Sequence, residues 1–207
     1  MFNPGLIDMI MRLRGRGISD NSVLRAMELV DRRHFVDQKY WDVAYDERSL
    51  PISCGQTLSP PFTVALLTQM LELKPDMKVL EIGTGSGYHV AVLSNIVKRV
   101  YSVERYKTLI AEAEQCLAKL KISNHVIRHG DGNYGWKGQA PFDRILLTCA
   151  IEKEPSRLLS QLADKSVLLA VIDGEVVRFR KVGKKTKTET LLKLKLPSIE
   201  AGKSKSL

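Results

Sequence analysis

Long hydrophobic stretches are missing from this 207-residue sequence. No apolar run approaches the roughly 20 residues that a helix needs to cross a bilayer. The segment from Met1 to Arg16 contains three arginines and Asp8, and no apolar stretch there ends in small residues. It therefore lacks the pattern of a secretory signal peptide. Both absences predict a cytoplasmic protein without a membrane partner.

Cysteine and histidine are also scarce, and their spacing gives no metal-ligand pattern. The three cysteines lie far apart and are expected to be reduced thiols. Two of the four histidines stand alone, and the other two lie four positions apart in a predicted strand, which separates them by roughly 13 Å. The sequence therefore predicts no metal, and each histidine is expected to be structural. These residues are Cys54, Cys116, Cys149, His34, His89, His125 and His129.

The formal net charge of +9 belongs mainly to the end of the chain. From Glu175 onward, ten Lys and Arg stand against three Asp and Glu, whereas the chain before Glu175 carries 22 against 20. Such an end usually forms a solvated surface, and attraction to acidic partners is the alternative. It has no interleaved aromatics and the chain has no base-flipping motif, so nucleic acid is not the expected partner. The prominent lysines are Lys184, Lys185, Lys187, Lys193, Lys195, Lys203 and Lys205.

The chain up to Lys74 is expected to be mostly helical. Apolar side chains at helical spacing predict a first helix that ends at Gly15 and Gly17. A second helix is predicted to begin near Asp20 or Asn21, either of which could cap it. Residues 50–61 contain too much Pro, Gly and Ser for regular structure and predict an ordered loop. A third helix is predicted from about Pro61, with Ser59 as its N-cap. The predicted buried face of the second helix consists of Val23, Leu24, Met27 and Val30.

Alternating strands and helices follow from Lys78 onward. Two final strands around residues 183–187 predict an antiparallel hairpin. The chain is thus predicted to be one Rossmann-like α/β domain, a doubly wound, mostly parallel sheet with helices on both faces. Residues 1–74 would form a helical extension, 75–175 the core, and 176–207 a basic hairpin and tail. The predicted strands are 79–82, 99–104, 125–129, 144–148, 166–172, 176–182 and 190–196, and the helices are 88–97, 107–121 and 154–163.

The sharpest motif is a glycine-rich turn between a predicted strand and a predicted helix, at 79–87 (VLEIGTGSG). It lacks the G-x-G-x-x-G spacing of dinucleotide-binding folds and the Gly-Lys-Ser/Thr of a P-loop. Its acidic residue suits a cationic ligand better than a pyrophosphate. The E-x-G-x-G-x-G pattern resembles the first motif of methyltransferases that bind S-adenosyl-L-methionine, although a tight turn alone would also use these glycines. The cofactor-binding residues predicted here are Glu81, Gly83, Thr84, Gly85 and Gly87.

Two further positions fit the same cofactor. Glu104 ends the next predicted strand after the glycine-rich turn, where a carboxylate commonly accepts hydrogen bonds from ribose hydroxyls. Asp131 and Gly132 follow the third predicted strand, where an acceptor with a small neighbour can contact the adenine edge. The alternative is that these residues are ordinary exposed strand ends.

The segment before the cofactor motif narrows the resemblance. Residues 50–52 (LPI) and 55–61 (GQTLSPP) are similar to the loop that marks the protein-L-isoaspartate O-methyltransferases. Residues 33–36 (RHFV), 128–132 (RHGDG) and 141–145 (PFDRI) are also similar to that family. The resemblance extends from about Ile7 to Thr148, whereas the last third of the chain departs from the family pattern.

The resemblance implies a reaction. Methyl would pass from S-adenosyl-L-methionine to the α-carboxyl of L-isoaspartyl residues in damaged proteins and peptides, and the ester would close to a succinimide that returns some normal aspartate. A carboxylate with a reference pKa of about 4 is ionised at neutral pH, so no general base is required. Ser59 would orient the carboxylate as the catalytic residue, and Gln56 and Thr57 would line the substrate pocket. No contact is predicted from the divergent last third.

Two alternatives stay open at this point. A methyltransferase of the same fold could act on another substrate, to which the basic tail would contribute. A homologue could also bind the cofactor without catalysis. The intact glycines, Glu81, Glu104, Asp131 and Ser59 argue against lost cofactor binding, whereas the divergent last third leaves lost catalysis open. The leading expectation is an active repair methyltransferase that is a monomer.

Overall fold

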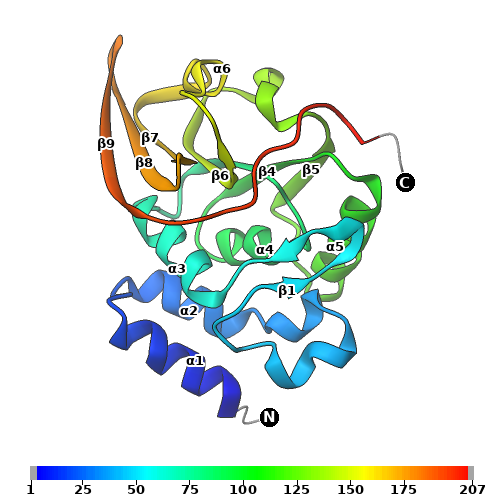
Figure 1. Ribbon diagram of the computed structural model, residues 1–207. Coiled ribbons are helices and arrows are strands. Elements are labelled where there is room, and N and C mark those ends of the chain that lie inside the picture. Colours follow the sequence, from blue (N-terminus) through cyan, green and yellow to red (C-terminus); the bar gives the residue numbers. More distant parts are fainter. Residues whose placement is uncertain (1–3, 205–207) are drawn as a thin grey trace.

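A seven-stranded mixed sheet forms the centre of the molecule (Figure 1). The computed structural model describes residues 4–204. The strand order is β5-β4-β3-β6-β7-β8-β9; the first five are parallel, and β8 and β9 are antiparallel additions. The predicted α/β fold with a C-terminal hairpin is therefore confirmed. The strands are β3 Lys78–Ile82, β4 Arg99–Glu104, β5 His125–His129, β6 Phe142–Ile151, β7 Leu162–Ile172, β8 Glu175–Val182 and β9 Lys185–Lys193.

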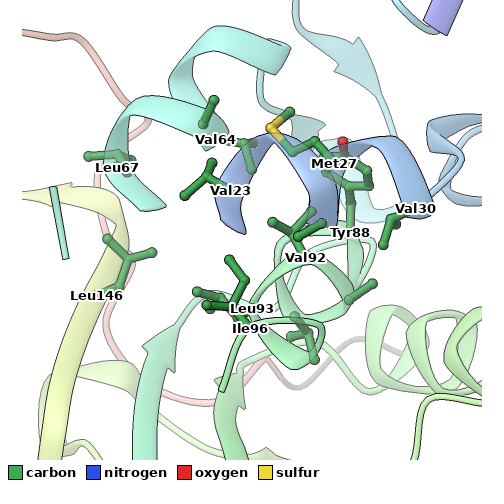
Figure 2. Packing of buried hydrophobic residues seen from close by; sticks show 14 of the residues in the cluster. Val23, Met27, Val30, Val64, Leu67, Tyr88, Val92, Leu93, Ile96 and Leu146 are labelled. Carbon is green, nitrogen blue, oxygen red and sulfur yellow. The ribbon is translucent and has the colours of Figure 1, made fainter. Parts of the chain in front are cut away.

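The two faces of the sheet are covered unequally. Alternate side chains of a strand point to opposite faces, so Val79 and Leu146 join one apolar cluster while Leu80 and Ile145 join another. The first cluster is the larger and includes side chains from five α-helices. Figure 2 shows the part of this cluster that lies near Leu146, with Leu93 and Ile96. The second packs against one short helix and against Trp136 and Ala140, which flank a 3-10 turn. The first face carries α1 Pro4–Gly15, α2 Asn21–Leu29, α3 Pro61–Met70, α4 Tyr88–Ser94 and α5 Lys107–Lys119, and the second carries α6 Ser156–Leu159, η4 Gly132–Tyr134 and η5 Lys137–Gln139.

The N-terminal helices form as predicted, but the loop after them is more regular. Asp20 caps α2 by accepting hydrogen bonds from the backbone N–H groups of Ser22 and Val23. The predicted buried face of α2 is confirmed. Between α2 and α3 the chain forms η1 Arg32–Phe35, η2 Gln38–Val43, β1 Leu50–Pro51, η3 Ser53–Gly55 and β2 Thr57–Leu58. Because β1 and β2 pair over only two residues each, the sequence shows no strand periodicity there.

Ser59 is not the N-cap of α3, so that prediction is wrong. The N-cap position is Pro60, and no side chain at that position caps the helix. The carboxylate of Glu47 instead accepts the exposed N–H of Phe62 at 3.2 Å. A residue from outside the helix thus satisfies its first turn, and the Ser59 hydroxyl is not used for this purpose.

Two predicted elements in the second half also have different limits. The predicted helix 154–163 is wrong beyond α6, because Leu162 already pairs with Phe142 and begins β7. Strand pairing with β6 therefore overrides the helical pattern. The hairpin turn is also shorter than predicted, because Val182 pairs directly with Lys185 and leaves a two-residue loop, the commonest hairpin connection.

The C-terminal segment returns across the sheet, as the red ribbon in Figure 1 shows. The N–H of Ala150 donates to the carbonyl of Pro197 at 2.8 Å, and the N–H of Ile199 donates back to Ala150 at 2.7 Å. A purely solvated tail is therefore a wrong prediction for residues 197–204, although Lys185 and Lys187 on β9 are exposed as expected. Lys205 lies outside the described residues. Within residues 4–204, no helix is long and apolar enough to cross a membrane.

Candidate active site

A cavity opens at the carboxyl ends of β3, β4 and β6. At this point the strand order reverses, because the chain runs from β3 outward to β5 and then returns to β6 on the other side. Ligands of open α/β sheets bind at such a switch point. The lining residues are Gln56–Ser59, Val64, Ile82–Ser86, His89, Val103–Tyr106, Leu109, Gly132, Thr148, Cys149 and Pro197–Glu200.

Most of the predicted site residues meet in this cavity. The substrate loop contributes Gln56, Thr57 and Ser59, and the cofactor motif contributes Gly83, Thr84 and Gly85, together with Glu104 and Gly132. Three predicted residues are not in its lining: Glu81, Gly87 and Asp131. The loop before α3 and the turn after β3, which a whole helix separates in the sequence, are therefore parts of one site.

The glycine-rich turn brings backbone close to the cavity. Gly83 has a φ of 97°, and a Cβ there would lie 2.4 Å from the Thr148 hydroxyl oxygen. That hydroxyl lies 2.9 and 2.8 Å from the carbonyl oxygens of Ile82 and Gly83, and its single proton can be donated to either or shared between them. A Cβ at Gly132 would similarly meet Ile82. These positions tolerate only glycine, and they leave a cradle in which a ligand can approach the backbone.

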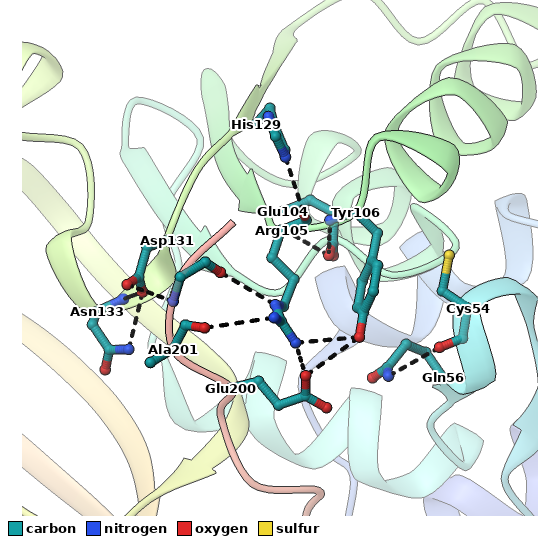
Figure 3. Close-up of polar contacts among 11 residues, drawn as sticks. Cys54, Gln56, Glu104, Arg105, Tyr106, His129, Asp131, Asn133, Glu200 and Ala201 are labelled. Carbon is teal, nitrogen blue, oxygen red and sulfur yellow. Dashed lines mark hydrogen bonds and ion pairs between the residues drawn. The ribbon is translucent and has the colours of Figure 1, made fainter. Parts of the chain in front are cut away.

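Glu104 organises the mouth of the turn. One carboxylate oxygen accepts the N–H of Gly85 at 3.0 Å, and the other accepts the N–H groups of Arg105 and Tyr106 at 2.7 and 3.0 Å. Figure 3 shows part of this arrangement. The carboxylate is 6% exposed and lines the cavity, so a free lone pair can accept a ligand hydroxyl. A hydrogen bond from a ribose hydroxyl to Glu104 stays a prediction, and the place of Glu104 in the cavity lining is compatible with it.

Glu81 lies behind the cavity wall. Its side chain is fully buried, and one carboxyl oxygen accepts the Ser102 hydroxyl at 2.7 Å. Ser102 is in turn hydrogen-bonded at 2.6 Å to Thr84, which lines the cavity. Direct contact between Glu81 and a cofactor ammonium group stays a prediction, and the described contacts connect it to the cavity through other residues.

Asp131 is used by the protein itself. Its carboxylate caps η4 at the N–H of Asn133 and accepts the N–H of Gly202, each at 2.8 Å. Asp131 lines a second, neighbouring hollow. Ile199 lines both this hollow and the main cavity. Gly132 lines the main cavity and Asp131 does not, and the adenine contact stays a prediction for both residues.

The substrate loop is fastened from behind by a residue that the sequence analysis missed. Arg32 is 0% exposed, and its guanidinium donates to the carbonyls of Ala44 and Ser59, both at 2.8 Å. It also lies 4.7 Å from the ring centroid of Tyr88, the first residue after the glycine turn. Among the residues that the structure describes, the Ser59 hydroxyl has no partner of its own. Sequence gives little warning of Arg32, because an arginine is expected at the surface.

The C-terminal segment supplies one wall of the cavity, which was not predicted. Glu200 forms an ion pair with Arg105, and the Arg105 guanidinium also donates to the carbonyl of Gly202 at 3.2 Å (Figure 3). The N–H of Ser204 donates to the Arg105 carbonyl at 3.0 Å. These contacts hold the segment against the loop that follows β4.

Two titratable side chains in the lining are neutral near physiological pH. Burial lowers the pKa of His89 to about 3. Burial also raises the pKa of the Cys149 thiol to about 12, and the negative charge of Glu104 adds to the effect. Neither group is suited to act as a general base near neutrality. No group of three His, Cys, Asp or Glu that could hold a metal occurs within the described part of the chain.

Comparisons with known proteins agree with this arrangement. The family description "Protein-L-isoaspartate(D-aspartate) O-methyltransferase" matches residues 6–199. A protein-L-isoaspartate O-methyltransferase from Maricaulis maris is 45% identical over 209 residues, covering 99% of this chain and 98% of its own. One from Parvibaculum lavamentivorans is 41% identical over 206 residues, covering 96% and 93%.

Solved structures give the same relationship. A protein-L-isoaspartate O-methyltransferase superposes with a TM-score of 0.86 at 25% identity, over 95% of this chain and 66% of its own. A candidate protein-L-isoaspartate O-methyltransferase from Plasmodium falciparum, solved with S-adenosyl-L-homocysteine, gives 0.81 at 25% identity, over 93% and 97%. With the match at residues 6–199 and the near full-length relatives, these findings show that the chain belongs to the protein-L-isoaspartate(D-aspartate) O-methyltransferase family.

Proposed function

We propose that this protein transfers a methyl group from S-adenosyl-L-methionine to the carboxyl group of L-isoaspartyl residues in damaged proteins and peptides. The observation that carries the proposal is the joining of the Gln56–Ser59 loop and the glycine-rich turn around one cavity. Family membership supports the same reaction, and the relative solved with S-adenosyl-L-homocysteine supports the cofactor.

The cofactor fits the cradle formed by the glycine turn. Gly83, Gly85 and Gly132 would admit it close to the backbone, and Glu104 would accept hydrogen bonds from its ribose hydroxyls. When bound, it supplies an electrophilic methyl group on a sulfonium. The protein's task is then to bring an acceptor to that methyl group and to exclude water.

Ser59 is the residue that we propose to orient the acceptor. The isoaspartyl carboxylate is already ionised at neutral pH, so no proton has to be removed by the protein. The free Ser59 hydroxyl would donate to one carboxylate oxygen, and Arg32 would hold the Ser59 backbone in place. Gln56 and Thr57 would contact the peptide around the reacting residue. Orientation of this kind is worth up to about 7–11 kcal/mol in favourable intramolecular systems.

We further propose that the chain acts as a single methyltransferase domain, as a monomer, in the cytoplasm. The substrate loop, the glycine-rich turn and Glu104 of one chain meet in the cavity, which supports a site that needs no residue from a second copy. Sedimentation of the purified protein at the concentration used for assays would test the monomer.

The decisive experiment follows methyl incorporation from labelled S-adenosyl-L-methionine into an isoaspartyl peptide, with its aspartyl twin as control. We expect base-labile methyl esters on the first peptide only. Cofactor binding without incorporation would identify a non-catalytic homologue, and incorporation into another class of substrate would identify a different methyltransferase. Absence of cofactor binding would reject the proposal altogether.

A further inference from the structure

A buried carboxyl and a buried imidazole face each other behind the cofactor turn. Glu81 on β3 is 0% exposed and His89 on α4 is 8% exposed. Carboxyl oxygen Oε1 of Glu81 lies 3.9 Å from imidazole Nδ1 of His89. Glu81 Oε1 has no hydrogen-bond partner among the residues that the structure describes. Such a buried acceptor is costly unless a proton satisfies it.

The hydrogen bonds on the far side of His89 determine where its proton lies. The Thr68 hydroxyl is 2.7 Å from the carbonyl of Val64, to which it can only donate. The same hydroxyl is 2.8 Å from His89 Nε2 and must therefore accept there. A neutral imidazole carries one N–H, so Nδ1 has a lone pair and no proton. Burial lowers the pKa of His89 to about 3, which agrees with the neutral form.

Glu81 Oε1 and His89 Nδ1, two hydrogen-bond acceptors, thus face each other on buried side chains that cannot turn to water instead. One proton between them removes the conflict, and Glu81 Oε1 is the atom that can hold it. Burial raises the pKa of Glu81 to about 8, opposed by the Ser102 hydrogen bond and supported by the negative charge of Glu104. The titratable groups that face Glu81 are therefore His89 from α4 and Glu104 from β4. The 3.9 Å separation is longer than a hydrogen bond, so the carboxyl or the ring must rotate slightly to close it.

Two routes connect this pair to the cavity. His89 is itself part of the cavity lining. Thr84, also in the lining, is hydrogen-bonded to Ser102, which donates to the other oxygen of Glu81. A charge placed in the cavity therefore acts on Glu81 across one side chain on the first route and two on the second, in a region of low dielectric constant where such effects are strong.

We propose that Glu81 and His89 hold one proton in the cofactor-free protein, and that binding of the cationic methyl donor expels it. This inference rests on the proposed function, because it requires the sulfonium donor to occupy the cavity. The proton leaves for solvent, and the ionised carboxylate balances the sulfonium charge. Methyl transfer turns the sulfonium into a neutral thioether, after which Glu81 takes a proton back. The Glu81–His89 pair thereby makes the binding site discriminate between the cationic methyl donor and its neutral demethylated product.

The sign of the pH effect follows from this exchange. Because donor binding releases a proton, its affinity should rise by about tenfold per pH unit while Glu81 is protonated in the free protein, and level off above the pKa of that group. S-Adenosyl-L-homocysteine carries the same amino and carboxylate groups but lacks the sulfonium charge, so it should not expel the proton. Titration of the amino group acts on both ligands, and the proton expelled by the sulfonium therefore appears in the comparison of the two. The dissociation constant of the donor, divided by that of S-adenosyl-L-homocysteine, should therefore fall by about tenfold per pH unit in this range, which corresponds to one released proton.

Titration calorimetry can measure this ratio from about pH 6 to about pH 9, in two buffers of different ionisation enthalpy that report the released proton directly. Glu81→Gln is the informative variant. Its amide oxygen can accept from Ser102 and its N–H can donate to His89 Nδ1, so it reproduces the protonated carboxyl and should fold. We expect a pH-independent ratio and no released proton for this variant. Glu114→Gln is the matched control, because Glu114 pairs with His125 at 2.9 Å away from the cavity; it should keep the wild-type slope.

Difference infrared spectroscopy gives a second readout on the unmodified protein. A protonated carboxyl band should be present without cofactor at neutral pH, disappear on addition of the donor, persist with S-adenosyl-L-homocysteine, and be absent from Glu81→Gln. Donor binding with a flat ratio, or an absent carboxyl band, would overturn the proton-holding pair while leaving the methyltransferase assignment intact. Failure of both ligands to bind at any pH would instead overturn the proposed function.

Discussion

At the scale of single residues, Ser59 combines a fixed backbone with a free side chain. The buried guanidinium of Arg32 holds its carbonyl, and Glu47 caps the following helix in its place. The two roles that sequence assigns to Ser59, helix cap and carboxylate donor, are therefore separated by the structure. Only the second is left for experiment to test.

We expect Ser59→Ala to lower kcat by about 10- to 100-fold, the cost of one positioning hydrogen bond of roughly 1.4–2.7 kcal/mol. Affinity for S-adenosyl-L-methionine should be close to native, because the hydroxyl orients the acceptor. The midpoint of thermal unfolding should also change little, since no helix cap is removed. Steady-state kinetics with an isoaspartyl peptide would measure the effect. Ser53→Ala is the control, because Ser53 is a half-buried serine of the same loop whose hydroxyl donates to Glu112 in α5. Equal losses in both variants would argue against a specific role.

Glu104 is the second residue whose contacts sharpen a prediction. It satisfies three backbone N–H groups, so an alanine there would disturb the loop as well as the cofactor. Glu104→Gln removes the charge and keeps one acceptor oxygen, which can still serve the N–H groups of Arg105 and Tyr106, but it loses the acceptor for the N–H of Gly85. We expect it to weaken S-adenosyl-L-methionine binding by about 1–3 kcal/mol, a typical loss for a charge-assisted hydrogen bond. Calorimetry would measure it, and an unchanged dissociation constant in a folded variant would reject the ribose role.

At the scale of elements, Gly87 decides how closely α4 can pack on α5. Its φ is 86°, and a Cβ there would lie 2.9 Å from the Cβ of Ala113 in α5. Gly87 is absent from the cavity lining, so its cofactor role stays a prediction, while the contact with Ala113 gives it a packing role. The glycines of one motif thus serve different purposes, which their spacing alone does not reveal.

Gly87→Ala should lower the free energy of unfolding by at least about 2 kcal/mol, from the left-handed backbone and the overpacking together. Gly138→Ala is a matched control in an open position with nothing within 4 Å of the added Cβ, and it should be neutral within about 1 kcal/mol. Urea unfolding of both variants would compare them. Similar midpoints would show that α4 and α5 adjust to the added carbon.

At the scale of the molecule, the N-terminal third and the C-terminal segment both contribute to the cavity at the edge of the core. The N-terminal extension brings the substrate loop, and the C-terminal segment covers the opposite side through Ile199 and Glu200. The core supplies the cofactor turn between them. The basic end of the chain therefore has two parts, an exposed hairpin and a docked segment.

Deletion of residues 198–207 should leave the sheet folded but weaken binding of S-adenosyl-L-methionine by about tenfold or more, since covering an isoleucine is worth about 1.5–3 kcal/mol. Calorimetry at low and high salt would measure this. The double substitution of Lys184→Gln and Lys185→Gln removes two hairpin charges without touching the segment, and it should bind normally. Native affinity after the deletion would mean that the segment is dispensable, as a solvated tail would be.

The sequence by itself determined the alternation of strands and helices, the cofactor turn, and the acid that ends β4. These features depend on local patterns, because periodicity, glycine and strand ends act over a few neighbouring residues. Only the tertiary structure decided that Arg32 lies under Ser59, that His89 faces Glu81, and that Ile199 closes the cavity. Each of these joins segments far apart in the chain, and local patterns carry no signal for which distant segment a side chain meets.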